Sequence, residues 1–384
     1  MLYIDPNVAG VFGMDLMTSG WLDGAFGGGG TGFLSHVQFD FRNAANMTGD
    51  MLLDVDPSHD VVATSNNSTS WDFSGGGTFS DVTKWYSPSV PTGAGVTATF
   101  GNGILNDVSA PMVTVTVDGA VVVGSLAFTN TQGTGYVLAG DGVAGHGITL
   151  DGNGAGATVS ISAGVAALQQ IQTSLTLADN TTFDIVAGGS LRLSGGVSET
   201  GGSRSITLIS GGTLTIDGSS SYTGGTTVNN GTLTTTANGT LGNGPLAINA
   251  ADSINSTVNL GSNQTVSSLS GTIAGSLSAQ VIVAAGTTLT VNQSSNTSFA
   301  GRIVLSPDVS AGGGGQLVKS GGGTLEVSGP PSLAVNSGIN VSDGTLRFNI
   351  AAGGAPSLVG TGVIAKISGQ AVLELAGSAA ALAY

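Results

Sequence analysis

A short sequence motif recurs about every twenty residues along the chain, and this periodicity limits the folds that the chain can adopt. The stretch GGTLTIDGSSSYTGGTTVNNGTL, residues 211–233, begins and ends on almost the same letters. Gly212 lies 23 residues after Gly189 and 19 before Gly231, and Gly344 lies 21 after Gly323. Self-similarity at such a period is the mark of a stacked repeat, in which each unit completes its core against its neighbours.

Within each repeat the sequence predicts very short strands. Segments such as SLRLSG (190–195), TLTIDG (213–218) and TLEVSG (324–329) place an apolar residue at every second position, so that Leu214 and Ile216 face one way while Thr213 and Thr215 face the other. A strand with two inward side chains buries too little to be stable alone. Three short strands and three turns per circuit of about twenty residues make one coil of a parallel β-helix.

The same arithmetic predicts the extent of this all-β fold. If about 300 residues follow the pattern, on the order of 15 coils stack along one axis. Residues 164–178, GVAALQQIQTSLTLA, contain a helical-looking AALQQIQ, but their strand-like flanks and length favour one more rung of the stack.

Composition excludes several classes of function. The hydrophobic share of 40% is too high for a disordered chain, so a core is buried. Only eight basic residues are present, scattered along a chain of net charge -15, which argues against a nucleic-acid partner. The absence of cysteine excludes disulfides and thiolate metal sites, and no motif calls for a cofactor.

The first 65 residues differ from the rest. They are richer in aromatic residues and show weak strand and helix signals, so we interpret residues 1–65 as an irregular segment, a cap or the remnant of an upstream module, and residues 66–384 as the β-helix domain. No apolar run is long enough for a transmembrane segment. The amino end carries Asp5 and Asp15 before the first basic residue, Arg42, and so lacks the basic start of a signal peptide; we expect the natural chain to begin upstream of Met1.

One segment matches a known repeat in detail. Residues 210–233 resemble the autotransporter passenger-associated repeat. The consensus sequence of that repeat consists of a G-G-T-L-T-L strand, a Tyr-Thr-Gly-Gly-Thr turn and a Val-x-x-Gly-T-L strand. The best-matching repeat spans 211–233, and a degraded copy without the Tyr-Thr-Gly-Gly core spans 320–348. The matching positions are Gly212, Thr213, Leu214, Tyr222, Thr223, Gly224, Gly225, Thr226, Val228, Gly231 and Leu233.

This resemblance implies a right-handed parallel β-helix carried by an exported bacterial protein, located at the cell surface or secreted. We therefore expect a non-enzymatic structural stalk or adhesin-like passenger, with surface glycans or other cell-surface proteins as its partners. Two alternatives remain open: a polysaccharide lyase or glycoside hydrolase built on the β-helix, and a carbohydrate-binding surface module.

An enzyme of this fold would need acidic and basic side chains gathered on one outer face. Asp141, Asp151 and Asp217 each precede a glycine and are interpreted as turn formers, while Arg192 and Arg347 look isolated. The glycines at 312–315 lead to a lysine, but Val318 stands where a phosphate loop needs glycine. The three histidines, His36, His59 and His146, are too dispersed to predict a metal trio or a catalytic triad.

The densest acidic stretch could offer oxygen ligands to calcium. Its spacing is not that of an EF-hand loop, and we favour a solvated linker for these weak candidates. They are Asp50, Asp54, Asp56 and Asp60.

Aromatic residues pose a separate question. Tyr222 could be an exposed platform for a sugar ring, but because it belongs to the repeat we favour a ring that covers a coil corner. Trp71 and Trp85 are predicted to cap the first coil, where edge amides and carbonyls would otherwise be open.

Overall fold

The structure, a computed structural model, describes residues 52–55, 61–64, 69–71, 75–86, 89–101, 112–131, 133–307, 313–329, 332–333, 336–349 and 364–376. By internal contacts the chain divides into two units, Met1–Thr69 and Ser70–Tyr384. The predicted boundary lay between residues 65 and 66. In the first unit, β1 (Leu52–Val55) pairs antiparallel with β2 (Val61–Thr64).

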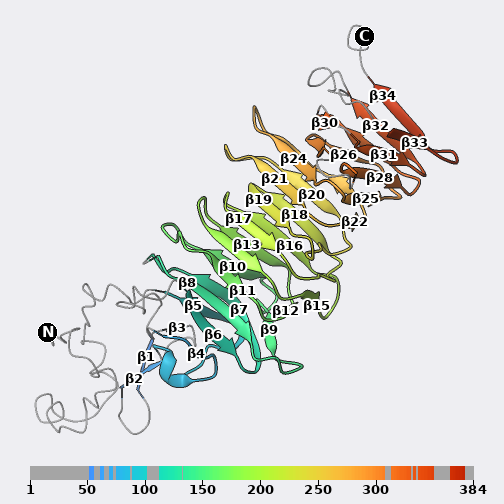
Figure 1. Cartoon of the computed structure of the whole chain (residues 1–384). Helices are drawn as coiled ribbons and strands as arrows, with labels where there is room; N and C mark the ends of the chain where they lie inside the picture. Colours follow the sequence, from blue (N-terminus) through green and yellow to red (C-terminus); the bar gives the residue numbers. More distant parts are fainter. Residues whose placement is uncertain are drawn as a thin grey trace, which may run out of the picture. The chain divides into compact units, whose positions relative to one another are not determined.

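The second unit is a parallel β-solenoid of about ten turns (Figure 1). Each regular turn contributes one strand to each of three faces, as in the succession β24, β25, β26 and then β27 on the first face again. Its described residues contain no α-helix, only the 3-10 turn η2 (Val82–Lys84). The predicted all-β parallel β-helix is therefore confirmed.

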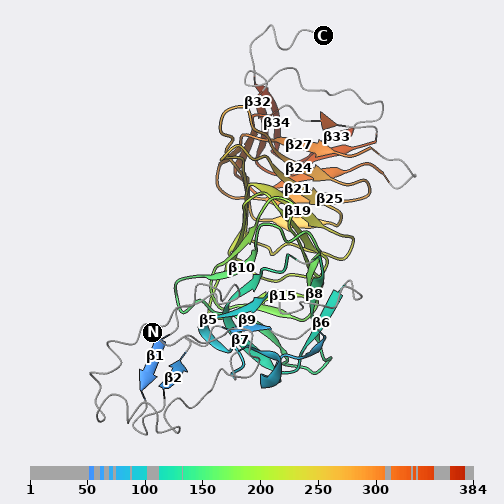
Figure 2. The same cartoon turned by 90° about the vertical axis from the view of Figure 1, so that its left-hand side faces the viewer.

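The first face is a parallel sheet of 11 strands, several of which lie one above another in Figure 2. In spatial order they are β4 (Gly77–Thr78), β6 (Met112–Val117), β8 (Gly135–Gly140), β11 (Gln169–Ile171), β14 (Ser190–Leu193), β17 (Thr213–Ile216), β19 (Gly231–Thr235), β21 (Ser256–Leu260), β24 (Ala279–Val283), β27 (Arg302–Leu305) and β30 (Ser332–Leu333).

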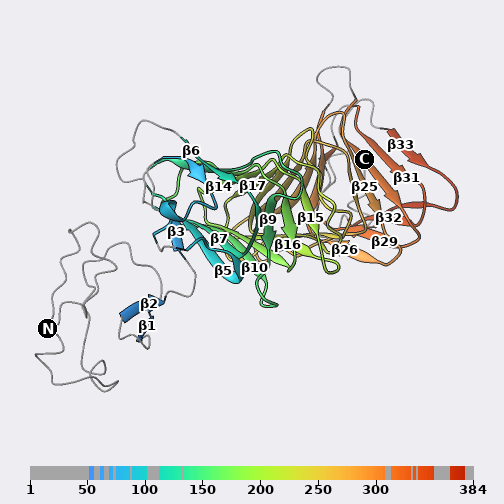
Figure 3. The same ribbon diagram turned by 90° about the horizontal axis from the view of Figure 1, so that it is seen from below.

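The second face follows the same stack, as Figure 3 shows for β5, β7, β10 and β16. Near its start lies the short β3 (Thr69–Trp71). The face comprises β5 (Gly93–Phe100), β7 (Ala120–Phe128), β10 (Ala157–Ile161), β13 (Thr181–Ile185), β16 (Ser205–Ile209), β18 (Gly225–Asn229), β20 (Leu246–Asn249), β23 (Leu269–Ser270), β26 (Thr297–Phe299), β29 (Thr324–Val327), β32 (Thr345–Asn349) and β34 (Val372–Ala376).

The third face begins on the first half of β7 and is interrupted in the middle of the stack. Between its two parts only a bridge from Val197 to Ser220 continues the ladder. The turns that follow β17 and β19 therefore have no third strand, and the first of them, between β17 and β18, carries Tyr222 and Thr223 of the repeat motif. The strands are β9 (Gly147–Leu150), β12 (Leu175–Leu177) and β15 (Val197–Glu199), then β22 (Gln264–Val266), β25 (Thr288–Asn292), β28 (Gln316–Ser320), β31 (Gly338–Val341) and β33 (Ile364–Ile367).

Parallel register stacks equivalent inward residues directly on one another. Leu214 lies opposite Leu191 on one side and Leu233 on the other, and Val258 continues the row. Each member of this column is at most 1% exposed: Leu191, Leu214, Leu233, Val258, Val281 and Ile303. The predicted alternation holds at Leu214 and Ile216, which are buried, and at Thr213 and Thr215, which are not.

The first turns are closed by an aromatic cluster. Trp71 and Trp85 form a bridge and pack edge to face with ring centroids 5.2 Å apart, and both are buried. The Trp85 indole donates to the Phe79 carbonyl at 2.8 Å, and Phe100 stacks on Phe128 behind them. The two tryptophans thus lie at the start of the solenoid, where a cap was expected.

The structure confirms the expected rung at residues 164–178 but has fewer coils than expected. Residues 164–178 do form a rung, because β11 and β12 fall within them. The estimate of 15 coils is too high, because coils are longer than twenty residues where turns lengthen: Val137 lies opposite Gln170, 33 residues later.

A pair of substitutions tests the inward and outward assignment. Leu214→Asp buries a carboxylate in the apolar column and should lower the free energy of unfolding by several kcal/mol. Thr215→Asp changes a half-buried outward position beside Arg192 and should be nearly neutral. Thermal and chemical denaturation measure both, and equal losses would contradict the assignment.

Candidate functional site

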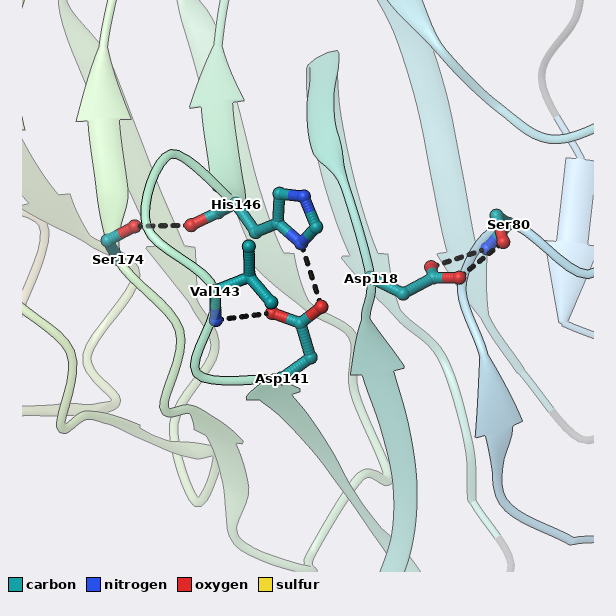
Figure 4. Close-up of polar contacts among 6 residues, drawn as sticks. All are labelled: Ser80, Asp118, Asp141, Val143, His146 and Ser174. Carbon is teal, nitrogen blue, oxygen red and sulfur yellow. Dashed lines mark hydrogen bonds and ion pairs between the residues drawn. The ribbon is translucent and has the colours of Figure 1, made fainter.

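The loop between β8 and β9 brings an aspartate, a histidine and a serine together (Figure 4). One Asp141 carboxylate oxygen accepts the Val143 N–H at 3.0 Å and the other lies 2.7 Å from His146 Nδ1. The Ser174 hydroxyl donates to the main-chain carbonyl of His146 at 3.2 Å, not to the imidazole. The imidazole is therefore not placed as a base for this serine, and the cluster closes a loop.

Electrostatics agree with this interpretation. The Val143 N–H holds the pKa of Asp141 below its ordinary value, and the contact with His146 lowers it further. A carboxyl group with a lowered pKa stays ionised and does not serve as a general acid near neutral pH. Nearby, Asp118 accepts both the N–H, at 3.0 Å, and the hydroxyl of Ser80, which ties β6 to the preceding turn (Figure 4).

Glu199 organises the turn that carries the repeat motif. Its carboxylate accepts the Thr223 N–H at 2.9 Å, the Thr223 hydroxyl at 2.7 Å and the Arg204 N–H at 2.7 Å. Partial burial acts to raise the pKa of Glu199, but the two N–H groups and the hydroxyl outweigh it and lower the pKa. The motif threonine is thus fastened to the coil before it.

Asp217 joins three successive coils. Its carboxylate accepts from the Thr236 hydroxyl and from the Arg192 guanidinium. The Thr236 hydroxyl, followed by Arg192, lowers the pKa of Asp217. The interpretation of Arg192 as isolated is therefore wrong, because its partner stands one coil further on.

Arg347 is likewise paired, contrary to expectation. Its guanidinium lies 2.9 Å from Glu374 in the next coil and 3.6 Å from Glu326 in the coil before. Glu374 is the main cause of the raised pKa of Arg347. A row of alternating charge therefore crosses β29, β32 and β34.

Asparagine side chains supply a further set of coil-to-coil contacts that the sequence analysis missed. In each, a side-chain oxygen accepts the N–H of a residue in the next coil, at 2.8–3.0 Å. These contacts are Asn180 to Ser205, Asn249 to Thr272, Asn255 to Ser278, Asn263 to Thr288 and Asn296 to Thr324. Four of these asparagines directly precede a strand, which was the available signal, whereas Asn249 is the last residue of β20.

The lysine that follows the glycine run at 312–315 does not face a phosphate. Lys319 lies on β28, and its side chain points into the interior of the solenoid, where it is fully buried. Its ammonium donates to the carbonyls of Ser320 at 2.8 Å, Gly321 at 2.6 Å and Asp343 at 3.3 Å. Burial lowers the pKa of Lys319, while Asp343 acts in the opposite direction.

Tyr222 is fully buried, so its ring is not available to a surface sugar. Its hydroxyl lies 2.7 Å from the Thr226 hydroxyl, and its ring lies so close to Gly242 that a Cβ there would stand 2.7 Å from a ring carbon. Trp85 is also buried. Neither aromatic residue therefore provides the exposed platform that the carbohydrate-binding alternative requires.

The other motif residues build the turn itself. Leu214, Val228 and Leu233 are inward and buried. Gly212 has no room for a side chain, since a Cβ would stand 2.3 Å from an Ile185 methyl carbon, and Gly225 adopts a φ of 96° against Pro245.

The acidic candidates for calcium fall mostly outside the described residues. Only Asp54 is included, through its backbone, which lies opposite Val62 in the β1–β2 pair. Over the part of the chain that the structure describes, no three histidine, cysteine, aspartate or glutamate side chains group as a metal site. No helix there is long and apolar enough to span a membrane.

No family model matches the chain, and neither does any curated protein or solved structure.

The buried tyrosine gives a pH-dependent prediction. Burial raises the pKa of Tyr222 from 10.0 to about 12. The unfolded chain loses this proton first, so the stabilisation is complete below pH 10 and is lost as the pH rises from 10 to about 12. This loss should amount to about 2–3 kcal/mol.

Tyr222→Phe should remove that dependence, at a constant cost of about 1 kcal/mol for the lost hydrogen bond. Urea denaturation between pH 8 and 12 measures it, with the exposed Tyr86→Phe as control. The interpretation fails if wild type and Tyr222→Phe lose stability in parallel across this range.

Proposed function

We propose that this chain is a non-enzymatic structural passenger of a bacterial surface or secreted protein, in which the stacked coils act as a stalk. The observation that carries the proposal is the use made of polar side chains. Asp217, Glu199 and Arg347 each bind groups of neighbouring coils. The hydrogen bonds and ion pairs of these side chains therefore connect neighbouring coils.

This pattern suits a mechanical element. Three sheets connect every regular coil to the next, and asparagine and charged contacts reinforce the corners and faces. Contacts that repeat at each step distribute strain evenly along a solenoid, and stability grows with the number of interfaces. A stalk that holds an attached module away from a cell needs this property and no active site.

The surface role is supported by the resemblance of residues 211–233 to the autotransporter passenger-associated repeat. The residues that carry it, among them Tyr222 and Gly225, are the ones that close a turn lacking its third strand. Partners of such a stalk are surface glycans or other cell-surface proteins, contacted through the corner loops.

Protease treatment of intact cells tests the location. An epitope inserted between Gly142 and Val143 lies in an exposed loop, since Val143 is 53% exposed. In the cells that produce the protein, the epitope should be removed by external protease or recovered from the medium, while a cytosolic marker stays intact. An epitope that is protected until the cells are lysed, and missing from the medium, would refute a surface or secreted role.

A separate assay tests the absence of catalysis. Purified protein incubated with pectin, alginate and related acidic glycans, with and without calcium, should release no product. Turnover that vanishes in Asp141→Asn or Asp217→Asn, but not in Asp118→Asn, would assign a hydrolase or lyase active site instead.

A further inference from the structure

One junction between coils has a complete strand ladder on only one of its three faces. It lies between the coil of β19 and β20 and the coil of β21, β22 and β23. On the first face β19 pairs with β21 along its whole length, as part of the stack in Figure 2. On the second face β20 pairs with β23 through Leu246 and Ala247, and a separate bridge joins Ala250 to Ile273. Within residues 133–307, which the structure describes without a gap, no strand of the preceding coil pairs with β22 on the third face.

The neighbouring junctions are better connected. The preceding one also lacks a third-face ladder, but there β18 and β20 pair from Thr226 to Asn229, and the Tyr222 ring packs against Gly242. At the following junction β22 pairs with β25 along all its residues. One coil later all three faces carry ladders, which join β24 to β27, β25 to β28 and β26 to β29. The junction before β21 is therefore the least connected of this series.

At this junction one side chain takes the place of the third-face ladder. Gln264, the first residue of β22, is 3% exposed. Its Oε1 accepts the Leu241 N–H at 2.8 Å, and its Nε2 donates to the Gly239 carbonyl at 3.1 Å. At the end of β22 the Ser267 N–H donates to the Gly244 carbonyl at 3.1 Å. A strand residue offers its neighbour the same pair of groups, one acceptor and one donor. The primary amide of Gln264 thus replaces a strand residue.

Other polar side chains assist at the same junction. The Ser262 hydroxyl donates to the Gly239 carbonyl and lies 2.6 Å from Gln264 Nε2. On the second face Asn249 Oδ1 accepts both the N–H of Thr272, at 2.9 Å, and its hydroxyl, at 3.1 Å. Side-chain amides and a hydroxyl therefore make connections that backbone ladders make in the regular coils.

We propose that this junction is a hinge about which the solenoid opens, and that Gln264 is the positioning residue that holds it closed. The stability of a solenoid is approximately the sum of its coils and of the interfaces between them, so the stack separates where an interface is least connected. The first-face sheet keeps the two sides joined, so the second and third faces part while β19 and β21 stay paired. The inference concerns the solenoid itself and does not rest on the surface role.

Hydrogen exchange of the 384-residue chain, followed by mass spectrometry and corrected for intrinsic rates, tests the hinge. The amides of residues 239–250 and 264–273, on the two faces that open, should exchange at least tenfold faster than those of the equivalent segments 288–299 and 316–327. The first-face strands β19 and β21 should stay as protected as β24 and β27. Equal protection of the four segments would overturn the proposal.

A pair of glutamine variants tests the role of the amide. Gln264→Leu removes both of its backbone hydrogen bonds, so exchange in the two junction segments should rise at least tenfold further while β19 and β21 remain protected. Gln293→Leu is the matched control, because Gln293 is also fully buried and donates to the Thr324 carbonyl of the next coil at 2.8 Å, but at a junction with three ladders. It should leave exchange in the junction segments within twofold of the wild type.

A milder variant covers the case in which Gln264→Leu fails to fold. Ser262→Ala removes only the hydroxyl beside the amide and should raise exchange in the same two segments by a smaller factor. Circular dichroism checks that each variant keeps its strand content. The hinge is refuted if neither junction variant raises exchange in these segments, or if Gln293→Leu raises it as much as Gln264→Leu.

Discussion

Register-matched stacking of inward side chains is the interaction on which this protein depends. A strand such as β17 has two inward residues, Leu214 and Ile216, and their burial is complete only because β14 and β19 lie on either side. Burying one such side chain is worth about 1.5–3 kcal/mol, which is too little to order a coil of some twenty residues in isolation. Order therefore belongs to the stack, and each coil supplies part of its neighbour's core.

The polar chemistry follows from this geometry. Because the coils are parallel and in register, an outward side chain meets the equivalent outward side chain of the next coil, and a turn residue meets the start of the next strand. Asp217 and Glu199 show the result, since each holds groups that are about twenty residues away in sequence. Lys319 shows the same geometry on the inward side, where backbone carbonyls of two successive coils accept hydrogen bonds from its ammonium group.

Sequence reasoning could predict what depends on local period and not what depends on coil length. Alternation of apolar residues is a local property, so the inward positions of Leu214 and Ile216 and the solenoid itself could be read from it. Contacts between coils require the offset from one coil to the next. That offset is 19 residues from Leu214 to Leu233 but 33 from Val137 to Gln170, so the partner of Arg192 could not be assigned. The inward lysine had a signal, because Lys319 follows buried Leu317 by two residues.

The variable offset has a consequence for how such a chain can change. The additional residues between β8 and β11 lie mainly in turns, including the loop that Asp141 closes onto His146, while the strands on either side keep their register. Insertions and substitutions in these corner loops therefore leave the buried column of inward side chains unchanged. The architecture thus separates the inward column, whose residues must fit one another, from the corners, whose length and sequence can change.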